Sequence, residues 1–292
     1  MSVRFVDNVR SHLVDVVNEL LPTATEARFA VAFMKHSGLS LIEPALDTCL
    51  ANGGHVEFVV GLDFHTTDAR SLRALRNLAS ASDRCELYCY SDPSDEAATY
   101  HPKLYLATRR HTLTAIVGSS NLTQGGLRDN VEVNAVLRLD RDGDEAQALL
   151  DVYARLKYQR TCFIPNSAYI DTYDEVAARV RATRERATAD PGTRSAVEAI
   201  RQRERDLPRP FVSPNSLGGW QKLVYAKLPA GEFATDDMYQ YVPEFVEVYP
   251  RNRNAEAKVR QILQQLRDLG LVVHLGQGRW VRRERVQTGP TA

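Results

Sequence analysis

Short apolar runs that alternate with helix-like patterns are the feature of this chain that most restricts its fold. The strand-like runs are residues 28–34, 55–62, 85–90, 102–108, 113–118 and 131–139. The patterns with helical spacing are residues 9–20, 41–51, 68–78 and 144–158. Strands and helices in this order predict an α/β fold in which helices flank a sheet.

Composition limits what the chain can be. Its 292 residues are 43% hydrophobic, which is enough for two domain cores. Lys plus Arg and Asp plus Glu number 37 each, so any charged binding site must be local. The apolar runs are too short to span a membrane and residues 1–10 lack a signal-peptide pattern, which predicts a cytoplasmic protein without membrane contact. The four cysteines lack C-x2-C zinc spacing and are expected to be buried thiols.

The composition changes along the chain and predicts three parts. Residues 1–165 form the α/β domain. Residues 166–210, rich in Ala, Arg and Glu and interrupted by Pro191-Gly192, predict a partly helical linker. Residues 211–286 hold three helix patterns, the last ending at Gly270, and two short strands around a Gly-rich turn. Three helices and a hairpin predict a winged helix-turn-helix domain.

Polar residues near strand ends of the first domain form a candidate catalytic site. His101 and Lys103 are two apart on a predicted strand, so their side chains leave it on one face. The next strand runs into a loop with the sequence GSSN at 118–121, whose hydroxyl, amide and N–H groups could surround an oxyanion. Glu132 follows on the strand after that. Each motif alone is ordinary loop chemistry, but together they favour a site in which a nucleophile, a cation and a carboxylate converge.

This run resembles the phospholipase D superfamily, whose motif is H-x-K followed by G-S-x-N, with an acidic residue on the next strand in its nuclease branch. The resemblance implies that His101 is the nucleophile that forms a phosphohistidine and that Glu132 hydrogen-bonds and orients it. The residues that it implies for holding the phosphate oxygens are Lys103, Ser119 and Asn121. The Asp usual five residues after the Lys is Thr108 here, which argues against lipid chemistry more than against catalysis.

Two expectations about the chemistry follow. The sequence lacks the acidic and histidine spacings of metal-dependent nucleases, so neither a metal nor a cofactor is expected, and Lys103 would neutralise developing charge. The motif occurs once, because every other histidine lacks a lysine two residues on. Since the superfamily uses a second copy across a twofold axis to protonate the leaving oxygen, a homodimer through the catalytic domain is expected. A monomer with another proton donor is the alternative.

The predicted winged helix concentrates basic charge on a candidate DNA-binding face. Residues 251–285 contain nine Lys and Arg against three Asp and Glu. Arg260, Gln261 and Gln264 lie opposite the apolar stripe of the last helix and suit base edges in the major groove. The candidate DNA-binding residues are Arg251, Arg253, Asn254, Lys258, Arg260, Gln261, Gln264, Arg279, Trp280 and Arg282. A solvated helix face with a basic tail is the alternative interpretation.

The same stretch has features beyond its charge. They are an F-x-x-x-D-x-Y start at 233–239, a Pro-x-Asn loop at 250–252, a K-x-R-Q-x-L-Q-x-L-R-D-x-G helix at 258–270 and a G-x-G-x-[WY] wing. In these features it resembles the C-terminal winged helix of restriction endonucleases that cut only adenine-methylated DNA. The resemblance implies binding of a methylated site, without identifying which residues read the methyl group. Trp280 either packs against a methylated base or fills the core, which is the more usual place for a wing aromatic.

Together these patterns favour a metal-independent endonuclease for double-stranded DNA, a restriction enzyme that depends on adenine methylation. One alternative is a restriction nuclease for an unmodified sequence. Another is a DNA-binding regulator with an inactive phospholipase D-like domain, although the intact set of His101, Lys103, Asn121 and Glu132 argues against inactivity. A lipid phosphodiesterase would leave the winged helix unexplained.

Overall fold

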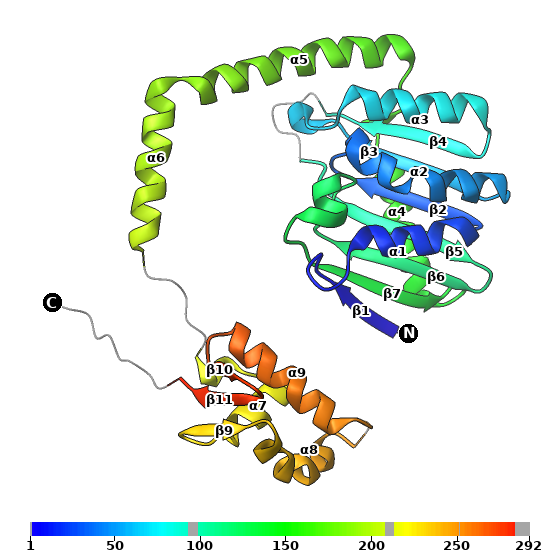
Figure 1. Ribbon diagram of the computed structural model, residues 1–292. Coiled ribbons are helices and arrows are strands. Elements are labelled where there is room, and N and C mark those ends of the chain that lie inside the picture. Colours follow the sequence, from blue (N-terminus) through cyan, green and yellow to red (C-terminus); the bar gives the residue numbers. More distant parts are fainter. Residues whose placement is uncertain (1, 93–98, 208–212, 251, 284–292) are drawn as a thin grey trace. The chain divides into compact units, whose positions relative to one another are not determined.

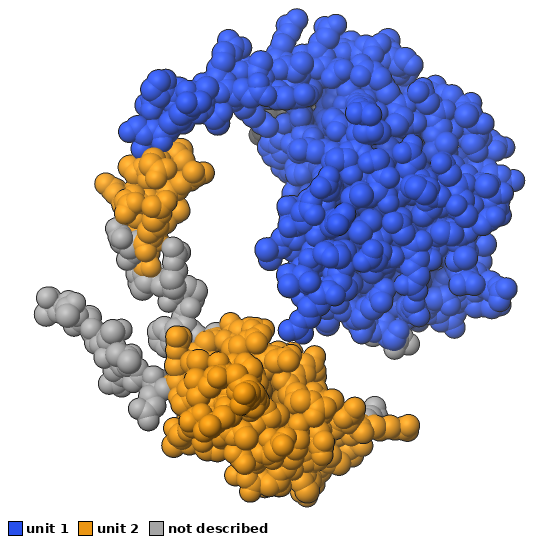
Figure 2. Space-filling view, viewed as in Figure 1, with its two compact units in different colours: residues 1–195 blue, residues 196–292 orange. Residues whose placement is uncertain are grey.

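The computed structural model describes residues 2–92, 99–207, 213–250 and 252–283 (Figure 1). The chain divides into two compact units, residues 1–195 and residues 196–292 (Figure 2). This division falls inside the predicted linker, while the limits of the three predicted parts remain predictions. Within the described ranges, no helix combines the length and the apolar character needed to cross a membrane.

An eight-stranded mixed sheet forms the centre of the first unit (Figure 1). Its strands are β1 (Ser2–Val6), β2 (Glu26–Val31), β3 (His55–Gly61), β4 (Cys85–Tyr90), β5 (Lys103–Arg109), β6 (Thr112–Gly118), β7 (Asn134–Asp140) and β8 (Cys162–Phe163). Their order across the sheet is β1-β7-β6-β5-β2-β3-β4-β8. The pairs β2–β3 and β3–β4 are parallel, and the other neighbouring pairs are antiparallel.

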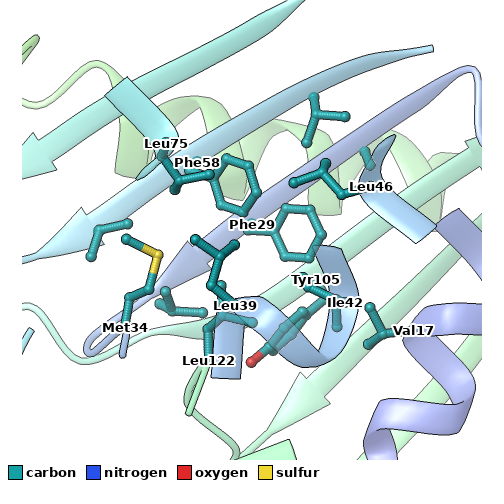
Figure 3. Packing of buried hydrophobic residues seen from close by; sticks show 14 of the residues in the cluster. Val17, Phe29, Met34, Leu39, Ile42, Leu46, Phe58, Leu75, Tyr105 and Leu122 are labelled. Atoms are coloured by element: carbon teal, nitrogen blue, oxygen red, sulfur yellow. The ribbon is translucent and has the colours of Figure 1, made fainter. Parts of the chain in front are cut away.

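Helices cover both faces of this sheet. They are α1 (Leu13–Leu20), α2 (His36–Ala51), α3 (Ala69–Ala81) and α4 (Asp144–Lys157), with the short turns η1 (Leu21–Thr23), η2 (Asp63–His65) and η3 (Gly125–Asp129). Buried side chains of α1, α2 and α3 pack on one face around Phe29, Phe58 and Tyr105 (Figure 3). The rings of Phe29 and Phe58 stack at 4.6 Å. The other face packs against Ala146 and Tyr153 of α4. The predicted α/β fold with flanking helices is therefore confirmed.

The predicted linker is helical over most of its length. It contains α5 (Ser167–Ala189) and α6 (Pro191–Asp206). The first half of α5 belongs to the core of the first unit through Ile170 and Tyr173, whereas residues 181–205 are exposed. The break predicted at Pro191 is present because proline starts a helix readily but cannot continue one, and the Asp190 carboxylate accepts the Thr193 N–H at 2.8 Å.

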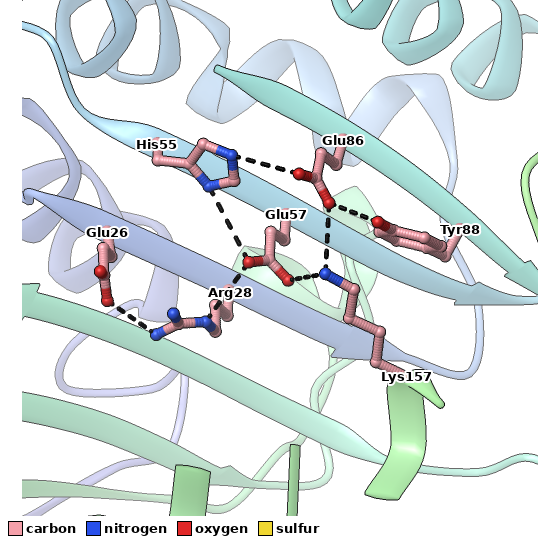
Figure 4. Close-up of polar contacts among 7 residues, drawn as sticks. All are labelled: Glu26, Arg28, His55, Glu57, Glu86, Tyr88 and Lys157. Atoms are coloured by element: carbon pink, nitrogen blue, oxygen red, sulfur yellow. Dashed lines mark hydrogen bonds and ion pairs between the residues drawn. The ribbon is translucent and has the colours of Figure 1, made fainter. Parts of the chain in front are cut away.

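A cluster of buried charges ties α4 to the sheet (Figure 4). Lys157 Nζ, at the end of α4, lies 2.8 Å from Glu57 Oε2 on β3 and 3.2 Å from Glu86 Oε2 on β4. Arg28 Nε lies 3.6 Å from Glu57 Oε1, and the His55 ring lies between Glu57 and Glu86. Burial alone would lower the pKa of Lys157, but its bonds to Glu57 and Glu86 outweigh burial and raise that pKa. The end of α4 is thus held by charge pairs that depend on one another.

The second unit is a small helical domain with a three-stranded sheet. Its elements are η4 (Pro214–Ser216), α7 (Gly219–Ala226), β9 (Glu232–Ala234), η5 (Asp236–Tyr241), α8 (Val242–Val248), α9 (Ala255–Asp268), β10 (Val272–Gly276) and β11 (Arg279–Arg282). The apolar stripe of α9, with Val259, Ile262 and Leu266, packs against Phe245 in the core. Gly270 follows α9 with φ +73°, a value that favours glycine at a helix end. The winged helix-turn-helix prediction is confirmed, and β9 adds a strand that the sequence does not predict.

The structure differs from the sequence prediction at several element ends. β1 is not among the predicted strands; it is a five-residue edge strand in which Val3 and Phe5 are exposed and only Val6 is buried. β8 is too short, at two residues, to give a pattern. β7 begins at Asn134, which leaves Glu132 in the preceding loop. β5 begins at Lys103, which leaves His101 before the strand.

Replacing Lys157 by Met should destabilise the first unit, because the Glu57 carboxylate would stay buried with only Arg28 and His55 nearby. We expect a loss of about 3 kcal/mol, measured by urea unfolding followed by circular dichroism. Both tryptophans, Trp220 and Trp280, lie in the second unit, so the urea midpoint of their fluorescence should not move.

A double variant, Lys157→Met with Glu57→Gln, provides the control for this prediction. It removes both charges and should recover part of the lost free energy of unfolding. A circular dichroism transition in Lys157→Met that equals the wild-type transition would contradict a stabilising role for the cluster.

Candidate active site

Four strand ends meet at one edge of the large sheet. β2 ends at Val31, which pairs with Lys103 at the start of β5. β6 ends at Gly118, which pairs with Asn134 at the start of β7. Because β7, β6, β5 and β2 are consecutive neighbours, the segment with His101 and the GSSN loop at 118–121 emerge side by side (Figure 1). The edge therefore gathers the predicted catalytic segments.

His101 and Lys103 are in direct contact at this edge. Lys103 Nζ lies 2.5 Å from Nδ1 and 2.9 Å from Nε2 of His101, and it donates to the His101 carbonyl oxygen at 3.1 Å. The prediction that His101 lies on the strand is wrong, since β5 begins two residues later. The H-x-K spacing still brings the side chains together, because a residue before a proline, here Pro102, favours extended backbone. The histidine is exposed, whereas Lys103 is 8% exposed.

The surroundings of this pair lower both pKa values. Partial desolvation of its ring lowers the pKa of His101, and the charge of Lys103 lowers it further. Burial also lowers the pKa of Lys103, against which the carboxylate of Glu132 acts. A lowered pKa keeps the His101 imidazole neutral at neutral pH, which is the form that can attack phosphorus.

Buried polar side chains fix the shape of the GSSN loop. Asn134, 1% exposed, donates from Nδ2 to Ser120 Oγ at 2.8 Å and accepts the Ser120 N–H at 3.3 Å. The Tyr105 hydroxyl donates to the Ser120 carbonyl oxygen at 3.0 Å. A Cβ at position 118 would lie 2.4 Å from Asn134 Oδ1, so only glycine fits there. The second serine of the loop is therefore a structural residue that holds its neighbours in place.

Asn121 is fixed by the chain that leaves β2. Its Oδ1 accepts the Phe33 N–H at 3.1 Å, and the Leu122 N–H donates to the Phe33 carbonyl at 3.2 Å. The Lys35 N–H continues this pairing by donating to the Leu122 carbonyl at 3.0 Å. With its oxygen engaged, Asn121 keeps its amide N–H groups as donors for a ligand.

Ser119 and Glu132 contact each other, in an arrangement that differs from the predicted one. The Ser119 hydroxyl donates to Glu132 Oε2, and Asn130 Nδ2 donates to Glu132 Oε1 at 3.4 Å. The prediction that Glu132 lies on a strand is wrong, since β7 begins at Asn134. The His101 ring nitrogens contact Lys103, and orientation of His101 by Glu132 stays a prediction. Glu132 acts on the site through Ser119 and through its charge near Lys103.

Several residues that shape the site are not predicted from the sequence. They are Phe33, Tyr105, Ser120 and Asn134. The signal for Asn134 is a polar residue inside an apolar strand pattern, since such a buried amide needs partners. Among the described residues, no group of three or more His, Cys, Asp or Glu side chains is arranged to hold a metal ion.

The predicted recognition residues of the second unit lie on the open face of α9. Arg260, Gln261 and Gln264 are exposed, as their positions opposite the apolar stripe predict. Arg260 Nη1 donates to the Tyr239 hydroxyl at 2.6 Å, and Lys258 Nζ donates to Gln261 Oε1 at 2.9 Å. These bonds orient the polar side chains along one side of the helix.

The remaining candidates have contacts within the domain. Asn254 caps α9, since its Oδ1 accepts the Ala257 N–H at 3.4 Å. Arg279 Nε lies 2.9 Å from Glu232 Oε1, and Arg282 Nε donates to the Tyr225 hydroxyl at 3.2 Å. Arg253 is exposed, and Arg251 lies outside the described residues.

Trp280 belongs to the core of the second unit. It is 5% exposed, and its Nε1–H donates to Thr235 Oγ1 at 2.9 Å. The core interpretation is therefore confirmed, and the inclusion of Trp280 among the DNA-contacting residues is corrected, because a buried ring cannot stack on a base.

Comparison with known families gives two matches. Residues 18–155 match the family described as "Cardiolipin synthase, PLD-like domain". Residues 221–282 match the family described as "Dam-replacing HTH domain". No curated protein matches the sequence.

Similar solved structures include NucT from Helicobacter pylori and Nuc, a phospholipase D family member from Salmonella typhimurium. NucT is 12% identical with a TM-score of 0.42, over 56% of this chain and 99% of its own. Nuc is 18% identical with a TM-score of 0.43, over 57% of this chain and 99% of its own. The family matches agree with both resemblances drawn from the sequence. This chain joins a phospholipase D-like domain to a C-terminal helix-turn-helix domain of the Dam-replacing type.

Proposed function

We propose that this protein is a metal-independent endonuclease that cleaves double-stranded DNA in the cytoplasm through a phosphohistidine. The main support is the contact of Lys103 Nζ with the His101 ring beside Ser119 and Asn121, in a chain that also holds a helix-turn-helix domain. A neutral imidazole next to a buried cation suits a phosphodiester, because the cation offsets charge that develops on the phosphate. The helix-turn-helix domain makes DNA the substrate class.

In the proposed reaction, a ring nitrogen of His101 attacks phosphorus and forms an N–P bond. The bond from phosphorus to the leaving oxygen breaks, and that oxygen takes a proton from a second imidazole. This second imidazole is His101 of the other chain in the homodimer proposed below. Water then attacks phosphorus and loses a proton to the second imidazole, while the N–P bond breaks and releases free His101. The non-bridging oxygens are stabilised by Lys103, Ser119 and Asn121, while Glu132 holds Ser119, so no step requires a metal.

Cleavage should persist in excess EDTA and should require His101. His101→Ala should lower the cleavage rate by at least about 10³-fold and leave DNA affinity unchanged, because phosphate docking does not need the nucleophile. Cleavage is measured on gels with plasmid DNA, and affinity by fluorescence anisotropy. His111→Ala is the matched control, since this exposed histidine lies at the turn between β5 and β6.

Two results would contradict this mechanism. The first is complete loss of cleavage in EDTA with recovery on addition of Mg²⁺. The second is a normal cleavage rate in His101→Ala. A protein that binds DNA but cuts neither methylated nor unmethylated substrates would instead favour a regulator with an inactive catalytic domain.

We further propose that adenine methylation directs the enzyme to its site, as in a modification-dependent restriction enzyme. The support is the match of residues 221–282 to the Dam-replacing helix-turn-helix family and the polar face of α9. Arg and Gln side chains suit base edges in the major groove.

The second domain alone, as a fragment of residues 211–286, should bind duplexes with methylated adenine more tightly than matched unmethylated duplexes. Arg260→Ala should weaken specific binding by about 1–3 kcal/mol, as expected for a base contact, measured by titration calorimetry. Arg267→Ala is the control, because this arginine is bound to Asp268 at 2.8 Å. Equal affinity for both duplexes would leave a nuclease for an unmodified sequence as the better proposal.

We also propose that the active enzyme is a homodimer in which two copies of His101 share one site. An uncovered apolar face supports this. Phe5, Val117 and Val133 are 73%, 42% and 63% exposed, and Phe5 and Val117 both pair with Ala135 in β7. Residues directly opposite each other on neighbouring strands point to the same face of the sheet. Val117 immediately precedes the GSSN loop, so this apolar patch borders the candidate site. An exposed apolar patch of this kind suits contact with a second subunit.

Mixing His101→Ala chains with wild-type chains should test the shared site. If one site needs both histidines, heterodimers are deficient and activity falls below the fraction of wild-type chains after subunit exchange. Exchange is verified with chains of different mass, and Phe5→Glu should give an inactive monomer by weakening the interface. Activity strictly proportional to wild-type chains, or an active monomer, would contradict the shared site.

A further inference from the structure

An exposed aromatic side chain is connected to the candidate nucleophile through the ring of Phe33. Phe64 is 55% exposed, although most large apolar side chains of this unit are buried. Its ring meets the ring of Phe33 at 6.5 Å with an interplanar angle of 67°. Phe33 in turn meets the His101 ring at 5.7 Å and 76°. The rings of Phe64, Phe33 and His101 therefore form a row that runs from solvent to the residue proposed to attack phosphorus.

The backbone at this position is strained. Phe64 has φ +59° and ψ +9°, and His65, the next residue, has φ +50°. Two consecutive residues with side chains in the left-handed region are uncommon, and a bulky aromatic residue there is an outlier. Such strain persists only where the surroundings enforce it, and it is often found at ligand sites. A strained turn that directs an aromatic ring into water does not serve burial.

Several contacts enforce the turn. The Asp63 carboxylate accepts the Tyr100 N–H at 2.8 Å, directly before His101. On the far side, the Tyr173 hydroxyl donates to the Thr67 carbonyl at 2.8 Å. Arg184 of α5 donates from Nη2 to the Phe64 carbonyl oxygen at 3.3 Å. The turn is thus fixed to the catalytic segment and to α5, while the Phe64 ring stays open.

Acidic and basic side chains both lie near the turn that carries the ring. Both acidic residues of the segment 62–69 are already engaged within the fold, since Asp63 accepts from Tyr100 and Asp68 accepts the His36 and Ser71 N–H groups at 2.9 and 2.8 Å. Arg184 reaches the turn from α5. A flat apolar ring with a basic neighbour suits a nucleotide, whose base stacks while its phosphate meets positive charge.

We infer that Phe64 is a stacking platform for a nucleobase next to the cleaved phosphodiester. The inference rests on the proposed function and deepens it, because a base that stacks on a protein ring must leave its own stack. The substrate engaged at the site would then contain an unpaired or extruded nucleotide. Phe64 is a substrate-binding residue, separate from the groups that act on phosphorus.

The test uses a 12-nucleotide single strand with 2-aminopurine at every third position, because the fluorescence of this base falls when it stacks. Full-length protein with His101→Ala binds this strand without cutting it. Binding should quench the fluorescence, and Phe64→Ala and Phe64→Leu should remove the quench and weaken affinity about 5- to 150-fold, while Phe64→Trp should preserve both. Tyr158→Ala, which removes an aromatic ring that is 76% exposed at the end of α4, should change neither.

A second variant separates stacking from folding. Phe64→Gly removes the ring but accepts positive φ, so its melting temperature should equal or exceed that of the wild type while the quench is lost. An undiminished quench in Phe64→Ala and Phe64→Gly would overturn the inference. Failure of the proposed function gives a different result. The protein with His101 would then cut no DNA, whether or not 2-aminopurine fluorescence is quenched by the His101→Ala protein.

Discussion

The junction between β2 and β5 is the constraint on which the candidate site depends. β2 pairs in parallel with β3 and antiparallel with β5, so its C-terminal end meets the first residue of β5. Beyond the strand, Phe33 and Lys35 continue to pair with the loop after β6. One stretch of backbone therefore positions Lys103, through its partner Val31, and Asn121, through Phe33. A shift of β2 by one residue would move both groups together.

Two buried lysines of the first unit differ in whether an anion lies close to them. Lys157 lies within 3.2 Å of two carboxylates, which raise its pKa above the usual value. Lys103 is buried to a similar extent, but Glu132 acts on it only at a distance, and its pKa is lowered. A buried cation without a close anion is costly unless a ligand supplies the negative charge. This difference favours Lys103 as a phosphate contact.

Periodicity and motif spacing predict most strands, the helices and the motif-bearing segments. They do not predict the contacts of a side chain whose partners lie far away in the sequence. The apolar patterns predict six of the eight strands of the large sheet along the chain, but not their order across the sheet. H-x-K with G-S-x-N identifies segments that the fold brings together. The hydrogen bond of Glu132 to Ser119 was not predictable, because it depends on where β7 begins. The turn at Phe64 is not predicted either, because no local sequence pattern indicates a phenylalanine in the left-handed backbone conformation. Apart from Trp280, which is buried in the core, the predicted catalytic and DNA-binding residues keep their roles as predictions.

The helix that leaves the first unit also contributes to its candidate site. α5 begins within the core, where Ile170 is buried and the Tyr173 hydroxyl bonds to Thr67. Further along the same helix, Arg184 donates a hydrogen bond to the Phe64 carbonyl oxygen. A helix is stiff over this length because each turn is hydrogen-bonded to the next. Any force on the far part of α5 therefore acts on the turn that holds Phe64, so residues 170–184 belong structurally to the first unit.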